Sequence, residues 1–278
     1  MQLGIFAKTF VRPTLGETLD AVVNSGLDCI QFNFSCAGLP TLPERIEPAL
    51  EREIRRELEV RRLTMAAVSG TFNLIHPNLA RRWDGLAQLK VLIAAARQIG
   101  TSVITLCTGT RDPDDMWRWD PDNDSPEAWR DLTASLNEVL PMAEAHDVTL
   151  AFEPEVGNVV NSARKGRRLL DELKSPHLKV VMDGANLFHP GDLSRMKDIL
   201  NKAFDLLGKD IVIAHAKDLR RDGEMRNAAA GKGVLDYELY LSLFAGFDFR
   251  GPLILHGLDE KEVPESVAFL RGKMEITE

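Results

Sequence analysis

The chain contains 278 residues, of which 44% are hydrophobic and 27% are charged, and its formal net charge at pH 7 is −8. These values are ordinary for a soluble globular protein, and the length suits one β/α domain of roughly 250 residues. The negative charge disfavours a nucleic-acid partner, which would favour a basic surface. No apolar run approaches about 18 uninterrupted residues, so no membrane span is expected.

The cysteines and the N-terminus bear on the compartment. Cys29, Cys36 and Cys107 show no CxxC or paired spacing. Cys29 and Cys107 lie in apolar runs of strand type, which indicates reduced core thiols in a reducing compartment. The first residues, MQLGIFAKTF, contain no basic segment before a long apolar run, so no signal peptide is expected. These features predict a cytoplasmic protein.

In the first part of the chain, short apolar runs alternate with segments of helical pattern. Thr14 and Glu17 have the spacing of a capping box, which predicts a helix that starts at Leu15. Gly100 follows a long helical pattern and marks its end. The predicted strands are Leu3–Ala7, Cys29–Phe34, Leu63–Val68 and Ser102–Cys107, and the predicted helices are Leu15–Asn24, one within Glu44–Arg62, and Leu79–Ile99.

The second part continues the same alternation. Ser125 and Pro126 have the residue types of an N-cap and a first helical position, so a helix is expected to start there. The predicted strands are Thr149–Phe152, Leu178–Met182, Ile211–Asp218 and Leu253–Leu255. The further predicted helices are Ser162–Leu173, Leu193–Leu207, Asp236–Phe244 and Pro264–Leu270.

Two polar segments between these elements are candidates for substrate contacts. The stretch SGTFNLIHP follows the third strand and contains His76, which is either a substrate contact or a solvated loop residue. The segment 108–124 is the longest without a regular pattern, and loops of that length are usually functional or disordered. It contains two tryptophans and two arginines, which argues against disorder. We therefore expect a lid or substrate wall in which Arg111 or Trp117 reaches the substrate.

Eight predicted strands alternate with seven or eight helices, and no change of composition marks a second domain. This order is typical of βα units around a parallel sheet. A Rossmann-type open sheet would favour a GxGxxG after the first strand, and none is present. The sequence therefore predicts a single (β/α)8 barrel that spans residues 1–278.

Four predicted strands end in a residue that can bind a metal. The apolar runs LAFEPE, KVVMDGAN, IVIAHAKD and PLILHG reach Glu153, Asp183, His215 and His256. In a β/α barrel the carboxyl ends of the strands meet at one face, so these four side chains are expected to converge. Two carboxylates and two imidazoles suit a divalent cation with positions left open for substrate oxygens.

The same motifs carry a resemblance to a known family. FEPE at Phe152–Glu155, MDGAN at Met182–Asn186, HAKD at His215–Asp218, GPLILH at Gly251–His256 and GKGVLDY at Gly231–Tyr237 occur in the family's order and spacing. The chain resembles the xylose-isomerase-like sugar phosphate isomerase/epimerase superfamily of TIM barrels. That superfamily includes keto-sugar 3-epimerases, hydroxypyruvate isomerases and inosose dehydratases, and it is related to endonuclease IV.

The resemblance implies roles for several residues. It implies metal ligands at Glu153, Asp183 and His215, and a substrate contact at Asn186, where many members have His. Basic residues after the seventh strand often touch substrate hydroxyls in the family, which makes candidates of Lys217, Arg220 and Arg221. The clearest departure is His256, because members that epimerise usually have Glu there.

The expected function is that of a divalent-metal-dependent isomerase or epimerase on a small keto-sugar, polyol or sugar acid. One ion, Mn²⁺, Co²⁺, Zn²⁺ or Mg²⁺, would hold a carbonyl and an adjacent hydroxyl oxygen and so acidify the C–H between them. Glu153 would take the proton and Lys217 would help to stabilise the enediolate. His256 would only hold the ion, which favours one-base isomerisation or elimination over 3-epimerisation and disfavours Mg²⁺.

Other functions remain open from the sequence. An inosose-type dehydratase could use the same scaffold, and a non-catalytic sugar-binding protein could retain the barrel and the metal. A DNA-repair endonuclease is disfavoured, because it would need further ligands on the early strands and a basic groove. The early strand ends offer Lys8, Gln31 and Asn33 instead. The sequence identifies neither the substrate nor the metal, and it leaves a homo-oligomer open.

Overall fold

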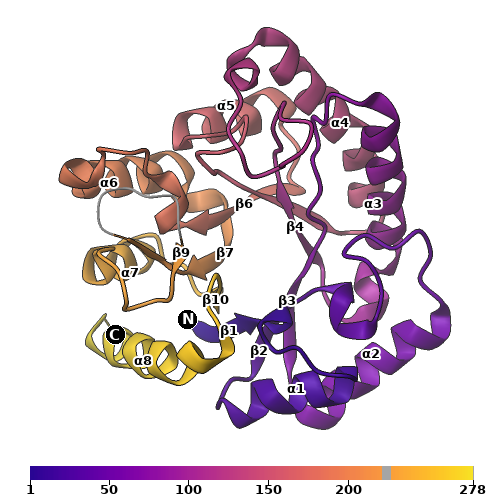
Figure 1. Cartoon of the computed structure of the whole chain (residues 1–278), viewed down its shortest axis with the longest axis vertical. Coiled ribbons are helices and arrows are strands. Elements are labelled where there is room, and N and C mark those ends of the chain that lie inside the picture. The colour runs from indigo at the N-terminus through magenta and orange to yellow at the C-terminus, as the bar shows by residue number, and fades with distance from the viewer. Residues whose placement is uncertain (221–226, 278) are drawn as a thin grey trace.

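A computed structural model describes residues 1–220 and 227–277. In this part of the chain, eight parallel strands close into a barrel in the order β1-β10-β7-β6-β5-β4-β3-β2. Helices surround the barrel, as the ring of ribbons in Figure 1 shows. The barrel strands are β1 (Gln2–Phe6), β2 (Cys29–Phe32), β3 (Thr64–Ser69), β4 (Val103–Cys107), β5 (Thr149–Glu153), β6 (Leu178–Asp183), β7 (Ile211–Ala216) and β10 (Pro252–Leu255). This architecture confirms the predicted (β/α)8 barrel.

Several helices begin or end where local sequence signals predict. Thr14 and Glu17 form the predicted capping box, and the side chain of Ser125 accepts a hydrogen bond from the backbone N–H of Ala128. Gly100 ends its helix in a left-handed conformation with φ of 105°. The α-helices are α1 (Leu15–Asn24), α2 (Pro48–Arg61), α3 (Leu79–Ile99), α4 (Pro126–Ala145), α5 (Ala163–Leu173), α6 (Met196–Leu207), α7 (Tyr237–Gly246) and α8 (Val263–Thr277).

Two elements near the C-terminus differ from the prediction. The final helix extends well beyond the predicted end at Leu270, because Lys273 pairs with Glu238 of α7 and Met274 packs against the core. The seventh strand ends at Ala216, and the next residues form the short strand β8 (Asp218–Leu219), which pairs antiparallel with β9 (Asn227–Ala228). Tertiary contacts therefore override the local signals at both places.

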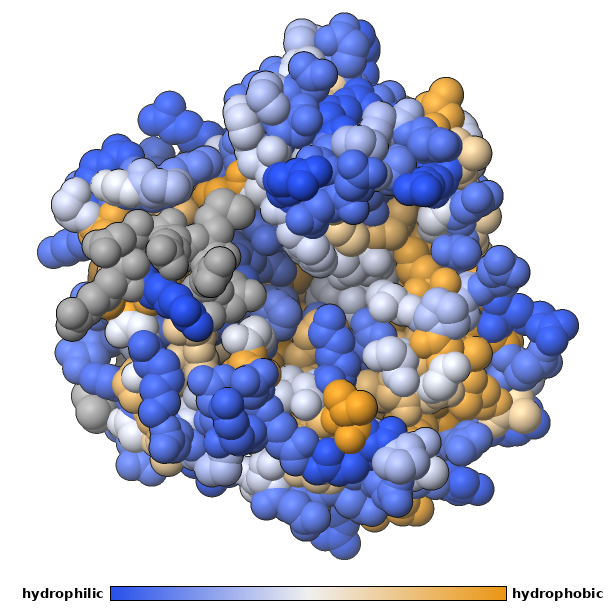
Figure 2. Space-filling model, in the orientation of Figure 1, coloured by the Kyte–Doolittle hydropathy of each residue, from blue (hydrophilic) through white to orange (hydrophobic). Residues whose placement is uncertain are grey.

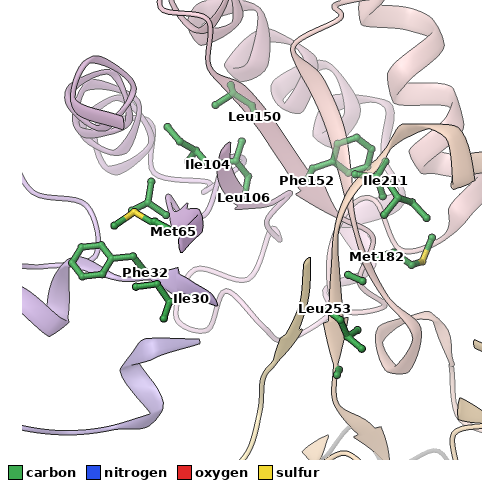
Figure 3. Packing of buried hydrophobic residues seen from close by; sticks show 14 of the residues in the cluster. Ile30, Phe32, Met65, Ile104, Leu106, Leu150, Phe152, Met182, Ile211 and Leu253 are labelled. Carbon is green, nitrogen blue, oxygen red and sulfur yellow. The ribbon is translucent and has the colours of Figure 1, made fainter. Parts of the chain in front are cut away.

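The alternation of side chains along the strands gives the barrel two cores. Most buried apolar side chains pack between the strands and the helices, and Figure 3 shows several of them, such as Leu150 and Phe152. A smaller cluster inside the barrel brings together residues of seven strands: Phe6, Cys29, Ala67, Ala151, Val181, Ile213 and Ile254. Because strand side chains alternate, the next residue on the inward face is two positions further along each strand. This rule determines which side chains line the barrel mouth.

The surface is mostly hydrophilic, as expected for a chain in which 27% of the residues are charged. Hydrophilic side chains cover most of the face in Figure 2, and apolar residues show between them in smaller groups. No helix in the described part of the chain is long and apolar enough to cross a membrane.

Candidate metal centre and substrate pocket

Three predicted ligands meet at the carboxyl ends of β5, β6 and β7. Glu153, Asp183 and His215 each lie two residues beyond a member of the inner core, so all three side chains extend the inward face of their strands. Their ligand atoms all lie within 4.8 Å of one another. His215 Nδ1 lies 3.4 Å from Glu153 Oε2 and 3.8 Å from Asp183 Oδ2.

Two atoms of this cluster are buried without a hydrogen-bond partner among the described residues. They are Asp183 Oδ2 and His215 Nδ1. The other oxygen of Asp183 accepts a hydrogen bond from the backbone N–H of Ala185 at 2.9 Å. A buried polar atom that makes no hydrogen bond costs free energy, so such a pair calls for an explanation. One divalent cation bound to both atoms and to Glu153 would satisfy them, and the oxygen and nitrogen donors suit such an ion.

The remaining nitrogen of His215 is held by a residue that the sequence did not identify as functional. His215 Nε2 lies 2.8 Å from Oε1 of Gln31, and Gln31 Nε2 donates to Thr105 Oγ1 at 3.1 Å. All three side chains are buried. The polar position in the apolar run CIQFNF was the available signal, because it places an amide inside the barrel.

Tyr240 of α7 supports the centre from behind. Its hydroxyl oxygen lies 2.8 Å from the carbonyl oxygen of Met182 and 3.1 Å from that of His215, and it accepts a hydrogen bond from the N–H of Gly184. A Cβ atom at Gly184 would lie only 3.0 Å from the tyrosine ring, so the close approach requires glycine. Tyr240 thus joins the ends of β6 and β7. Its position on a helix gave no signal for this role.

Lys217 provides the nearest cation. Its side chain is buried, and Nζ lies 3.4 Å from Asp183 Oδ2. Burial alone would lower the pKa of Lys217, but the negative charges of Asp183 and Glu153 outweigh it and raise that pKa. The pKa of Asp183 is raised by its burial, whereas that of Glu153 falls to about 2 because the attraction of His215 outweighs its burial.

His256 lies beside the three-residue cluster. Its ring centroid is 5.0 Å from that of His215 and 5.5 Å from that of Phe6. The group whose ligand atoms lie within 4.8 Å contains Glu153, Asp183 and His215 but not His256. Burial and the neighbouring His215 lower the pKa of His256 well below its usual value, so the ring is neutral. Coordination by His256 therefore stays a prediction.

A cavity of about 480 Å³ opens in front of the cluster. Trp117 lines it, and so does Asn186, whose amide donates a hydrogen bond to Glu153 Oε1. Glu155 also lines the cavity, and burial together with the charge of Glu153 raises its pKa to about 8. In the sequence, Glu155 stood out only as part of the FEPE motif. Its position two residues after Glu153 was the missed signal.

Two further residues expected at the substrate, Arg111 and His76, make their polar contacts outside the cavity lining. The guanidinium of Arg111 pairs with Asp131 at 2.5 Å, and His76 Nε2 lies 3.2 Å from the carbonyl oxygen of Pro113. Neither belongs to the described residues that line the cavity. Both side chains instead link the loops around the cavity, because each makes a polar contact with a neighbouring segment. Arg221 lies outside the described residues.

A second, more open cavity adjoins the first. Its volume is about 1290 Å³, and it shares Phe6, Lys8 and His256 with the substrate cavity. Lys8 follows β1, and its ammonium nitrogen lies 4.4 Å from the centroid of the Phe6 ring. The second cavity also contains Arg220, which the resemblance had suggested as a substrate contact.

Comparisons with known proteins agree with this architecture. Solved structures with similar folds include a 3-keto-D-glucoside 4-epimerase from E. coli, with a TM-score of 0.75, 16% identity and coverage of 98% of this chain and 99% of that one. A D-tagatose 3-epimerase-like protein has a TM-score of 0.79 and 14% identity, and the coverage is 100% and 98%. A D-psicose 3-epimerase has a TM-score of 0.74 and 17% identity, and the coverage is 99% of both chains.

At such identities, the structural matches establish the fold alone. The search of curated proteins finds no match. A family model described as xylose isomerase-like TIM barrel matches residues 19–273, which is most of the sequence. The chain therefore belongs to the xylose isomerase-like TIM-barrel family.

Proposed function

We propose that this protein is a divalent-metal-dependent isomerase or epimerase that acts on a small keto-sugar, polyol or sugar acid. The observation that carries the proposal is the cluster of Glu153, Asp183 and His215, in which two buried atoms have no hydrogen-bond partner among the described residues and two of the three side chains, Glu153 and His215, line the cavity. The solved structures named above, two epimerases and an epimerase-like protein, support the same class of substrate.

The cluster would hold the ion, which supplies Lewis-acid stabilisation to a substrate carbonyl and its neighbouring hydroxyl oxygen. Glu153 is the proposed base, because a carboxylate can bind a cation with one oxygen and accept a proton with the other. The amide of Asn186 fixes one of these oxygens. Lys217 would donate a hydrogen bond to the oxyanion that forms when the proton leaves.

The role of His256 bears on whether the reaction is an isomerisation, an elimination or a 3-epimerisation. A neutral imidazole has nitrogens that point in divergent directions, so a ring that binds an ion with one cannot reach the substrate with the other. We propose that Glu153 is the only base, which favours proton return to the same face of the substrate. Aldose–ketose isomerisation or elimination then fits better than 3-epimerisation.

Solvent exchange tests the proposal. The protein, loaded in turn with Mn²⁺, Co²⁺, Zn²⁺ and Mg²⁺, is incubated in D₂O with a panel of ketoses and inososes, and the products are analysed by mass and by NMR. We expect deuterium at a carbon next to a carbonyl, and loss of this exchange in Glu153→Gln. A mass loss of one water would instead identify a dehydratase. Sugar binding without any exchange would indicate a non-catalytic protein, and efficient 3-epimerisation would overturn the one-base mechanism.

A further inference from the structure

A line of three polar side chains crosses the interior of the barrel beneath the metal centre. Thr105 of β4, Gln31 of β2 and His215 of β7 are joined by the contacts of 3.1 Å and 2.8 Å described above. Their exposed fractions are 4%, 2% and 3%. β2 and β7 are not neighbours, because β1 and β10 lie between them in the closed sheet. Gln31 therefore reaches across the barrel to the ring of His215.

The contact with Gln31 bears on which nitrogen of His215 can bind a cation. A neutral imidazole carries one proton, and the hydrogen bond at one nitrogen decides which form is present. The carbonyl oxygen of an amide only accepts, so Oε1 of Gln31 requires the proton on Nε2 of His215. The lone pair is then on Nδ1, which lies toward Glu153 and Asp183 and has no hydrogen bond among the described residues.

If the amide of Gln31 had the opposite orientation, the proton of His215 would be on the other ring nitrogen. An NH₂ group directed at Nε2 would require a lone pair there and would place the proton on Nδ1, toward the two carboxylates. The hydroxyl of Thr105 can donate or accept and so is compatible with both orientations. The buried atoms without a hydrogen-bond partner among the described residues favour the first orientation, because a lone pair on Nδ1 and Oδ2 of Asp183 together form a binding site for a cation.

We propose that Gln31 is the positioning residue of the metal centre. Its carbonyl oxygen holds the Nε2 proton of His215, fixes the plane of the ring and leaves Nδ1 to the ion. Partners of this kind commonly bind the second nitrogen of a ligating histidine. A neutral amide does this inside the barrel without the burial of a further charge. The inference rests on the proposed function, since it assumes that the cluster binds a divalent ion.

Two substitutions of Gln31 by residues of similar size test its positioning role, with the affinity for metal as the readout. Gln31→Met removes the acceptor and keeps the volume, whereas Gln31→Glu keeps an acceptor oxygen at the same reach. Mn²⁺ binding is measured by competition with a chelator, and the melting temperature of each metal-free variant checks that it folds. We expect a 10–100-fold loss of affinity in Gln31→Met, and recovery of most of it in Gln31→Glu. Equal affinity in the wild type and Gln31→Met would overturn the proposal.

The tautomer is a readout that does not depend on activity or on any variant. In ¹⁵N-labelled wild-type protein loaded with Zn²⁺, we expect a metal-bound Nδ1 and a protonated Nε2 on His215. His177 is an internal reference, because its Nδ1 lies 2.9 Å from the carbonyl oxygen of Val148, far from the centre in the fold. A metal-bound Nε2 would refute the assignment. Failure of the wild type to bind any divalent ion would instead refute the metal centre itself, so the two failures are distinguishable.

Discussion

At the scale of single residues, two carboxylates of the same chemistry have different environments. The side chain of Asp183 is completely buried, whereas that of Glu153 is 15% exposed at the cavity wall. Glu153 also lines the cavity, whereas Asp183 does not, so only Glu153 of the two is placed to contact a substrate. This difference separates metal binding from proton transfer in the proposed mechanism.

The difference predicts distinct effects of two conservative substitutions. Asp183→Asn should reduce Mn²⁺ affinity by more than the roughly 10–100-fold that is typical of an outer partner, because it removes a ligand charge. Glu153→Gln should retain measurable metal binding and reduce solvent exchange by about 10²–10⁴-fold, because it removes the base. Chelator competition and deuterium incorporation measure the two effects. Full exchange in Glu153→Gln would show that another group is the base.

At the scale of elements, the long segment between β4 and α4 forms one wall of the cavity. Its order comes from its own hydrogen bonds, since the hydroxyl of Thr110 donates to the carbonyl oxygen of Arg118 at 2.8 Å, and Asn123 is buried beside it. Asp112 accepts hydrogen bonds from the N–H groups of Asp114 and Asp115 at 2.9 Å each. This framework presents Trp117 to the cavity.

The loop offers a matched pair of tryptophans. Trp117 and Trp119 are 47% and 43% exposed, but only Trp117 belongs to the described residues that line the cavity. We expect Trp117→Ala to raise KM about 3–10-fold, because an aromatic contact contributes roughly 0.5–1.5 kcal/mol. Trp119→Ala should leave KM unchanged. Steady-state kinetics on the substrate found in the exchange screen decides this, and equal effects of both changes would mean that the loop is only structural.

Low pH should destabilise the folded conformation of the same loop. The ion pair with Arg118 and the N–H of Asp114 lower the pKa of Asp112 to about 2. A carboxyl with a lowered pKa stabilises the folded form above its unfolded pKa of roughly 3.9, and this stabilisation is lost as the pH falls through the folded value. We therefore expect tryptophan fluorescence to report loop opening between about pH 4 and 2. Asp112→Asn should lack this transition, and its persistence in that variant would assign it to another group.

Individual residues of the candidate site show how much of it could be predicted from the sequence. The positions of Glu153, Asp183 and His215 at the ends of predicted strands were sufficient to predict that they converge, because the carboxyl ends of the strands meet at one face of a β/α barrel. The partner of Arg111 could not be predicted, since Asp131 reaches it only through the packing of α4. The role of Gln31 could not be predicted either, because Gln31 of β2 meets His215 of β7 only after the barrel closes. The roles of Arg111 and Gln31 thus depend on contacts between distant segments, which local sequence patterns do not predict.

At the scale of the whole molecule, an ion bound by ligands from three strands would contribute to the stability of the barrel. Binding to the folded state alone adds about 2.7 kcal/mol at an ion concentration of 100 times Kd. For a domain of this size, we expect the melting temperature to rise by roughly 5 °C when Mn²⁺ is added to chelator-treated protein. Calorimetry measures the rise, and Asp183→Asn is the control that should not respond. An equal rise in that control would place the stabilising ion elsewhere.

The ion pair between Lys217 and Asp183 bears on whether the chain would need a metal ion in order to fold. A buried carboxylate with no nearby cation would make folding depend on the ion. Here the chain carries its own counter-charge 3.4 Å from the Asp183 oxygen, so the barrel can be completed during synthesis and loaded afterwards. Donors of this kind bind several first-row metals, and availability then contributes to selection among them. If the cluster binds a divalent ion as proposed, we expect the identity of that ion to reflect the supply at the time of loading and to change with growth conditions.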